Sequence, residues 1–264
     1  MAMTFQKVYP QSPQSGKSAN DESNAFSLRK AMLTQLNNNI WPGRFARNMG
    51  LFTAAQQAKL LYSRAFVLGC GGLGGHVAAL LARTGIGALR LVDCDIFEES
   101  NLNRQQFCTE RTLGHPKAAA VAAGLADIGA HLELESIQTR ATADNLPDMV
   151  ASCDIVLDCL DNLPDRFALE DAALAAHIPF VHGAVLLDEG FCFVNTGSAS
   201  KMPQLYPQGK CDTTRAGSID PVIPAAIASL MVKLAVRALI APEKLSESLY
   251  HLDLAAMELE RFSF

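Results

Sequence analysis

Five polar side chains are of the types that bind a nucleoside triphosphate. They follow apolar, strand-like runs and are Asn101, Arg104, Gln105, Lys117 and Asp161. Guanidinium, ammonium and amide groups donate hydrogen bonds to phosphate oxygens, and a carboxylate beside them could hold Mg²⁺. Because Lys117 alone would more often be a solvated helix residue, the prediction depends on the joint pattern. That pattern favours a triphosphate site at the ends of neighbouring strands.

A glycine-rich turn supplies the backbone for such a site. Residues 65–68 predict a buried strand, and a sequence with G-x-G-x-x-G spacing follows at once. Without Cβ atoms, this backbone can approach phosphate oxygens at the start of a helix predicted over 76–82. Asp93 ends a second strand, over 88–92, at the distance where a carboxylate binds ribose hydroxyls. Alone, this fingerprint favours an NAD-dependent oxidoreductase. The predicted nucleotide-binding glycines are Gly69, Gly71, Gly72 and Gly74.

Alternating strands and helices must position these residues. The alternation predicts an α/β fold with a doubly wound, mostly parallel sheet, Rossmann-like, and an antiparallel C-terminal extension. Residues 1–40 form a separate N-terminal extension, disordered to about 22 and helical over 24–37, and a long loop without periodicity covers 196–219. Asp158 is expected to have a structural role. Further strands are predicted over 132–137, 154–157, 179–184, 190–194, 249–254 and 257–262, and further helices over 56–62, 116–128, 145–151, 164–176 and 223–240.

Composition excludes several classes of partner. The formal net charge is −5 and basic residues are scattered singly, which argues against nucleic acid or an anionic membrane. The apolar segment 221–242 contains Lys233 and Arg237, each costing roughly 2.5–3.5 kcal/mol at a bilayer centre, so we expect a buried helix. Seven cysteines without a C-x-x-C pair, and no secretory signal, predict a cytoplasmic protein.

From about Arg44 onward, the chain resembles the ubiquitin-activating-enzyme-like adenylyltransferases of the ThiF/MoeB/HesA type. The resemblance depends on G-C-G-G-L-G, L-V-D-C-D, N-L-N-R-Q, G-H-P-K and D-C-L-D-N, in the family's order and spacing. It implies that residues 41–264 form an adenylyltransferase domain that binds ATP and Mg²⁺. Asp93 would bind the ribose and Asp161 the metal. The polyphosphate would be bound by Asn101, Arg104, Gln105 and Lys117.

The resemblance also implies an activity and partners. Such proteins adenylate the C-terminal glycine of a ubiquitin-like, ThiS- or MoaD-like sulfur carrier and release pyrophosphate. Residues 44–48 look like the family's R-x-x-R-Q element, with Asn48 in place of Gln. This element would bring Arg47 to the γ-phosphate in the partner subunit of a homodimer. The alternatives are the NAD-dependent oxidoreductase and a non-catalytic ATP-binding scaffold subunit.

Two departures from the family pattern limit the expected chemistry. Relatives with a structural zinc use two C-x-x-C pairs, but residues 201–207 read KMPQLYP and no second pair follows. We therefore expect no zinc. Relatives that bond covalently to the carrier have a cysteine where Thr213 stands here, and Cys211 lies two residues earlier. We expect adenylation without a thioester or acyl disulfide, and the sequence leaves open whether Cys211 forms a covalent intermediate with the carrier.

Overall fold

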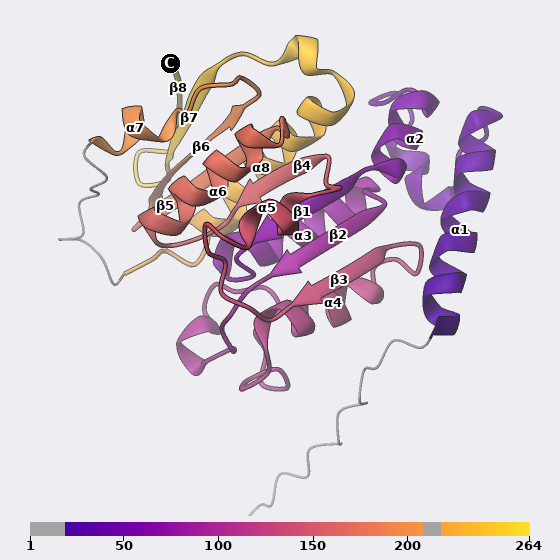
Figure 1. Cartoon of the computed structure of the whole chain (residues 1–264), viewed down its shortest axis with the longest axis horizontal. Helices are drawn as coiled ribbons and strands as arrows, with labels where there is room; N and C mark the ends of the chain where they lie inside the picture. The colour runs from indigo at the N-terminus through magenta and orange to yellow at the C-terminus, as the bar shows by residue number, and fades with distance from the viewer. Residues whose placement is uncertain (1–18, 208–217) are drawn as a thin grey trace, which may run out of the picture.

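Eight strands form one sheet in the computed structural model, which describes residues 19–207 and 218–264 (Figure 1). The spatial order is β3-β2-β1-β4-β5-β6-β7-β8. The first four pairings are parallel and the last three are antiparallel, so the predicted fold class is confirmed. The strands are β1 (Arg64–Leu68), β2 (Ala88–Val92), β3 (Glu133–Ile137), β4 (Ile155–Asp158), β5 (Phe180–Leu186), β6 (Glu189–Asn195), β7 (Ser248–Asp253) and β8 (Glu258–Ser263).

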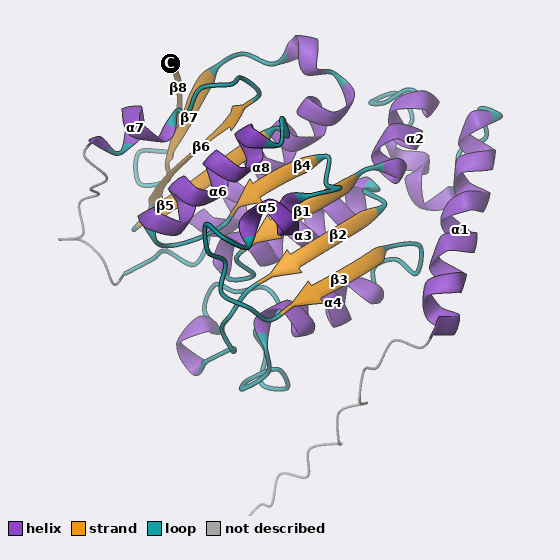
Figure 2. Ribbon diagram, in the orientation of Figure 1, coloured by secondary structure: helices purple, strands orange, loops and turns teal. Residues whose placement is uncertain are grey.

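Helices cover both faces of this sheet (Figure 2). Alternate residues of a strand point to opposite faces, and in β1 Val67 packs in one apolar core while Phe66 and Leu68 pack in the other. The first core is closed by α3 (Gly72–Thr84), α4 (Lys117–Ala126) and α8 (Ile223–Ile240), and the second by α5 (Leu146–Val150) and α6 (Leu163–Ala175). Because both faces of the sheet are buried, the sequences of the parallel strands are continuous apolar runs.

Helix α8 is a core helix of this fold. Within the described residues, it alone is long and apolar enough to cross a membrane. Its apolar residues, however, are buried against α3, β5 and β6, and Lys233 and Arg237 lie on its exposed face. The expectation of a buried helix is confirmed.

The N-terminal extension packs beside the sheet. Helix α1 (Ala19–Asn37), the 3-10 helix η1 (Gly43–Asn48) and α2 (Ala54–Tyr62) share a small core that includes Leu33, Phe45 and Leu61. The capping box predicted at the start of α2 is present, because the Gln56 N–H donates to Thr53 Oγ1 and the Thr53 N–H to Gln56 Oε1. The helix predicted over 24–37 begins earlier, at Ala19.

Two further predictions of element boundaries were wrong. Helix α3 begins at Gly72, not at residue 76, because packing against the sheet outweighs the poor helix propensity of its glycines. The segment predicted as a loop over 196–219 contains the short helix α7 (Met202–Leu205). The buried Glu170 carboxylate of α6 accepts hydrogen bonds from the N–H groups of Lys201 and Met202 and stabilises the start of α7.

Candidate functional site

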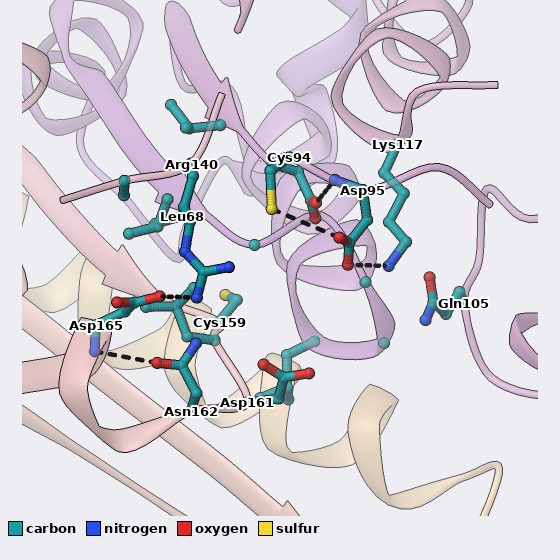
Figure 3. A pocket seen from close by; sticks show the side chains of 18 of the residues that line it. Leu68, Cys94, Asp95, Gln105, Lys117, Arg140, Cys159, Asp161, Asn162 and Asp165 are labelled. Carbon is teal, nitrogen blue, oxygen red and sulfur yellow. Dashed lines mark hydrogen bonds and ion pairs between the residues drawn. The ribbon is translucent and has the colours of Figure 1, made fainter. Parts of the chain in front are cut away.

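A cleft of about 550 Å³ opens at the carboxyl ends of β1, β2 and β4, beside the first turn of α3 (Figure 3). We call it the main cleft. The sheet order reverses between β1 and β4, and ligands of open α/β folds bind at such a switch point. The part of the cleft beside the second apolar core has the apolar lining residues Leu68, Val92, Ala141 and Leu160, together with Pro164 of α6. We call this the apolar end.

Two glycines of the turn between β1 and α3 are required by the protein's own backbone. Gly69 has a φ of +90°, a conformation that other residues avoid. A Cβ on Gly74 would lie 1.7 Å from the carbonyl oxygen of Gly69, so only glycine lets α3 approach the turn this closely. Gly71 and Gly72, like Gly69, line the main cleft. They therefore offer bare backbone to a ligand.

Asp93 lies at the floor of the main cleft, at the end of β2. Its Oδ2 accepts a hydrogen bond of 2.6 Å from the Cys70 N–H, and its Oδ1 accepts one of 2.8 Å from the Asp95 N–H. Burial raises the pKa of Asp93, and these N–H groups partly offset that rise. The backbone thus fixes the carboxylate in place, with lone pairs left for a ligand hydroxyl.

A second cavity of about 470 Å³ adjoins the main cleft and is lined almost entirely by polar atoms. We call it the polar recess. Arg104, Gln105, Lys117 and Asp161 line both cavities, and Asn101 lines the polar recess. The structure therefore brings all five predicted polyphosphate and metal residues into one continuous space.

The donors in the polar recess are positioned in different ways. The buried Lys117 ammonium pairs with Asp95, Nζ to Oδ2, at 3.1 Å. Burial raises the pKa of Asp95, but the hydrogen bond and charge of Lys117 outweigh it and hold that pKa below its usual value. The Arg104 guanidinium folds back on its own loop, donating to Ser100 O at 3.1 Å. Gln105 Oε1 is buried and has no hydrogen-bond partner among the described residues.

Asn101 has a structural task in addition. Its Oδ1 accepts a hydrogen bond from the Glu98 N–H at 3.1 Å and so caps the short helix η2 (Glu99–Asn101). Its amide group donates to Ser100 Oγ at 3.4 Å. Asn101 therefore fixes the loop that carries Arg104.

Two acidic residues, one at the end of β4 and one in the loop after it, have different surroundings. Asp158 is fully buried and accepts from the Leu160 N–H at 3.0 Å, and its Oδ2 lies 2.6 Å from His182 Nδ1. Burial opposes its ionisation, but the charge of Arg166 and the bond to His182 hold the Asp158 pKa below its usual value. Asp161 is exposed and makes no hydrogen bond with another described residue. Its free carboxylate fits a Mg²⁺ ion that also binds phosphates, since Mg²⁺ commonly uses only one or two protein carboxylates.

Arg47 lies outside both cavities. Its neighbour Asn48 donates to Thr84 O at 3.3 Å, at the last residue of α3, whereas the main cleft lies at the first turn of that helix. The helix is 13 residues long, which is roughly 20 Å. The chain therefore does not bring its own Arg47 to the site.

Sequence reasoning missed Arg140 and Asp165, which line the main cleft. Arg140 follows β3, and Asp165 lies in the first turn of α6. Their positions in the sequence could have identified them, because polar residues that follow parallel strands lie at the same edge of the sheet. Cys211 and Thr213 lie outside the described residues, and the expected absence of zinc stays a prediction.

Comparison with known proteins identifies relatives of this chain. The sequence profile of the ThiF family matches residues 45–264. The SAMP-activating enzyme E1 of Haloferax volcanii is 37% identical over 59% of this chain and 54% of its own length. The sulfur carrier protein ThiS adenylyltransferase of Bacillus subtilis is 35% identical over 63% of this chain and 52% of its own. The chain thus spans about half the length of these two curated relatives.

Solved structures share the fold. The crystal structure of E. coli MccB with ATP superposes with a TM-score of 0.71 over 94% of this chain and 79% of that one, at 19% sequence identity. At that identity the likeness concerns the fold, a doubly wound sheet with antiparallel C-terminal strands.

Proposed function

The chain belongs to the ThiF family, and on that premise we propose that it uses ATP to adenylate the C-terminal glycine of a small ubiquitin-like sulfur carrier, with release of pyrophosphate. The observation that carries this proposal is the continuity of the main cleft with the polar recess. An apolar end suits a nucleobase, and the polar recess gathers the cations Arg104 and Lys117 beside the free Asp161 carboxylate. The name of the Bacillus subtilis relative, a sulfur carrier protein adenylyltransferase, supports a carrier protein as the substrate.

ATP fits the site in one direction. The base lies at the apolar end, and the ribose hydroxyls approach Asp93, which the backbone already holds. The phosphates pass the bare backbone of Gly71 and Gly72 at the start of α3, where free N–H groups and the helix dipole favour anions. The polyphosphate then extends toward Arg104 and Lys117 in the polar recess.

The chemical step is a displacement at the α-phosphorus. One carboxylate oxygen of the carrier attacks it, the bond to the oxygen bridging the α- and β-phosphates breaks, and pyrophosphate leaves with that oxygen and its electrons. The protein aligns the reacting groups and neutralises the charge that develops. Lys117 and Arg104 supply cations for the leaving group. Asp161 would hold Mg²⁺, which supplies further positive charge to the phosphate oxygens.

The homodimer and the role of Arg47 are part of the proposal. Arg47 is exposed and lies at the far end of α3 from the chain's own cleft. In a closed two-fold dimer, each subunit can place such a side chain in the site of the other. We assign Arg47 to the γ-phosphate of the partner's ATP.

Neither alternative accounts for the site as well. An NAD-dependent oxidoreductase would give no role to Arg104, Lys117 and Asp161 together in the polar recess. A non-catalytic scaffold subunit would not need these three charged residues together in one site. The six described cysteines are free thiols, which supports a cytoplasmic protein.

Carrier-dependent exchange of labelled pyrophosphate into ATP tests the proposal. We expect exchange with a carrier that ends in glycine and none when that glycine is deleted. Asp161→Ala and Arg104→Ala should each lower the exchange rate by about 10²-fold or more, the usual effect of removing one charge-stabilising group. Exchange that survives both substitutions would refute the site assignment.

A further inference from the structure

The adenylation step proposed above gives no role to two charged side chains at the apolar end. The guanidinium of Arg140 and the carboxylate of Asp165 form an ion pair, Nη2 to Oδ2, at 3.7 Å. Both line the main cleft, and neither lines the polar recess. Figure 3 shows the pair reaching toward each other from two different elements, near Leu68 and Cys159. The pair therefore lies in the main cleft but outside the polar recess, to which the polyphosphate is assigned.

The backbone on each side of this pair is fixed. The Asp165 N–H donates to Asn162 Oδ1 at 3.1 Å, which caps α6. On the other side, the carbonyl oxygen of Arg140 accepts a hydrogen bond of 3.0 Å from Asn145 Nδ2. The side chains differ in freedom, since Arg140 is 71% exposed and Asp165 23%. Asp165 is thus the fixed partner, and Arg140 is the one that can adjust to a ligand.

We propose that Arg140 is a positioning and specificity residue that covers the face of the nucleobase, with Asp165 orienting its guanidinium. A planar guanidinium stacks on aromatic rings, and the apolar residues Leu68 and Ala141 next to it offer the base no competing polar contacts. The carboxylate of Asp165 limits the directions that the long Arg140 side chain explores. The inference rests on the proposed function only in taking ATP as the ligand.

The rival role for Arg140 is a grip on phosphates. Its charge reaches as far as Asp95, whose pKa it helps to lower, and Asp95 lines the polar recess. A phosphate grip needs only the positive charge, whereas stacking needs the planar group. Ligands with and without a base therefore separate the two roles.

The test is equilibrium binding to the full chain of three probes, which are ATP, adenosine and inorganic tripolyphosphate. Arg140→Ala should weaken ATP and adenosine by the same factor, about tenfold, the scale of a partly desolvated cation–π contact, and leave tripolyphosphate unchanged. Arg140→Lys keeps the positive charge but loses the planar group, so it should recover at most part of the ATP and adenosine affinity that Arg140→Ala loses. Asp165→Asn should give a smaller loss, about threefold, in the same pattern. Arg237→Ala, on the exposed face of α8, is the matched control.

Weaker tripolyphosphate binding with adenosine unaffected would overturn the inference in favour of a phosphate grip. So would full retention of affinity in Arg140→Lys, or no change in any variant. Thermal unfolding of each variant identifies a general loss of structure, which would weaken all three probes alike and also count against the inference. The binding test contains no carrier and is therefore independent of the exchange test. If the three probes bind as predicted but no carrier-dependent exchange occurs, the proposed function is refuted and the role of Arg140 in nucleotide binding still holds.

Discussion

Lys117 shows how a single side chain can be held ready for an anion. Its stem is buried, while its ammonium pairs with the carboxylate of Asp95, which is 63% exposed. Because the Asp95 carboxylate is exposed, phosphate oxygens can replace it without leaving the cation buried and unpaired. The sequence identified Lys117 by its place in a motif but could not predict Asp95 as its partner, because the pairing depends on where the chain turns after β2.

The pH dependence of stability gives a residue-level prediction at His131. Burial and the neighbouring cations Arg44 and Arg29 lower its pKa from 6.5 to about 4, and its Nδ1 lies 2.6 Å from Arg44 Nη1. Between pH 6.5 and 4 the unfolded chain binds a proton at this histidine that the folded chain does not. Stability should therefore fall as pH falls through this window, by at most about 1.4 kcal/mol per pH unit from this one group.

Urea unfolding at several pH values measures this effect. His131→Gln should show a flatter dependence between pH 6.5 and 4 than the unaltered protein, even if it is less stable throughout. His115→Gln, at an exposed position, is the control and should keep the original slope. Parallel curves for all three proteins would show that His131 does not titrate as described.

At the scale of elements, the contact between α3 and the turn after β1 makes the site possible. The built Cβ position at Gly74 overlaps the Gly69 carbonyl oxygen, whereas one at Gly75 would lie 3.4 Å from the Phe107 ring, an ordinary contact. We predict that Gly74→Ala lowers the free energy of unfolding by about 3 kcal/mol or more, the upper range for overpacking. Gly75→Ala should be neutral or stabilising, by up to about 1 kcal/mol, because alanine favours the helix. Equal effects of the two substitutions in urea unfolding would contradict this close approach.

Elements with strong local signals could be predicted from sequence. The predictions of a buried strand before Gly69 and of a capping box at Thr53 were confirmed, because apolar runs and caps depend on only a few neighbouring residues. The sequence did not predict where α1 and α3 begin, or that α7 exists. Packing decides them: Gly72 is helical despite its low propensity, and α7 depends on Glu170, over thirty residues earlier. Arg140 and Asp165 were missed for the same reason, since only the assembled sheet places them together.

At the scale of the whole molecule, the proposal requires two subunits, because Arg47 lies at the wrong end of α3 for its own cleft. Arg47→Ala and Lys117→Ala homodimers should both be nearly inactive in carrier-dependent exchange. When the two variants are unfolded and refolded together in equal amounts, about a quarter of the original activity should return. Half of randomly paired dimers are mixed, and each mixed dimer has one site with both residues intact.

The control is the same procedure with each variant alone, which should restore nothing. Size-exclusion chromatography confirms that dimers have re-formed. Dimers that form without any return of activity would show that Arg47 does not act across the interface, and an active monomer would refute the shared site altogether.

The central claim is that ATP is cleaved between its α- and β-phosphates while the carrier's carboxylate is attached to AMP. The most direct measurement follows the label from ATP labelled at either the α- or the γ-phosphate in a reaction with the carrier. The account predicts that the α-label appears on the carrier, only when the C-terminal glycine is present, and that the γ-label leaves as pyrophosphate. Transfer of the γ-label to the carrier, or release of ADP and inorganic phosphate with no label on the carrier, would contradict it.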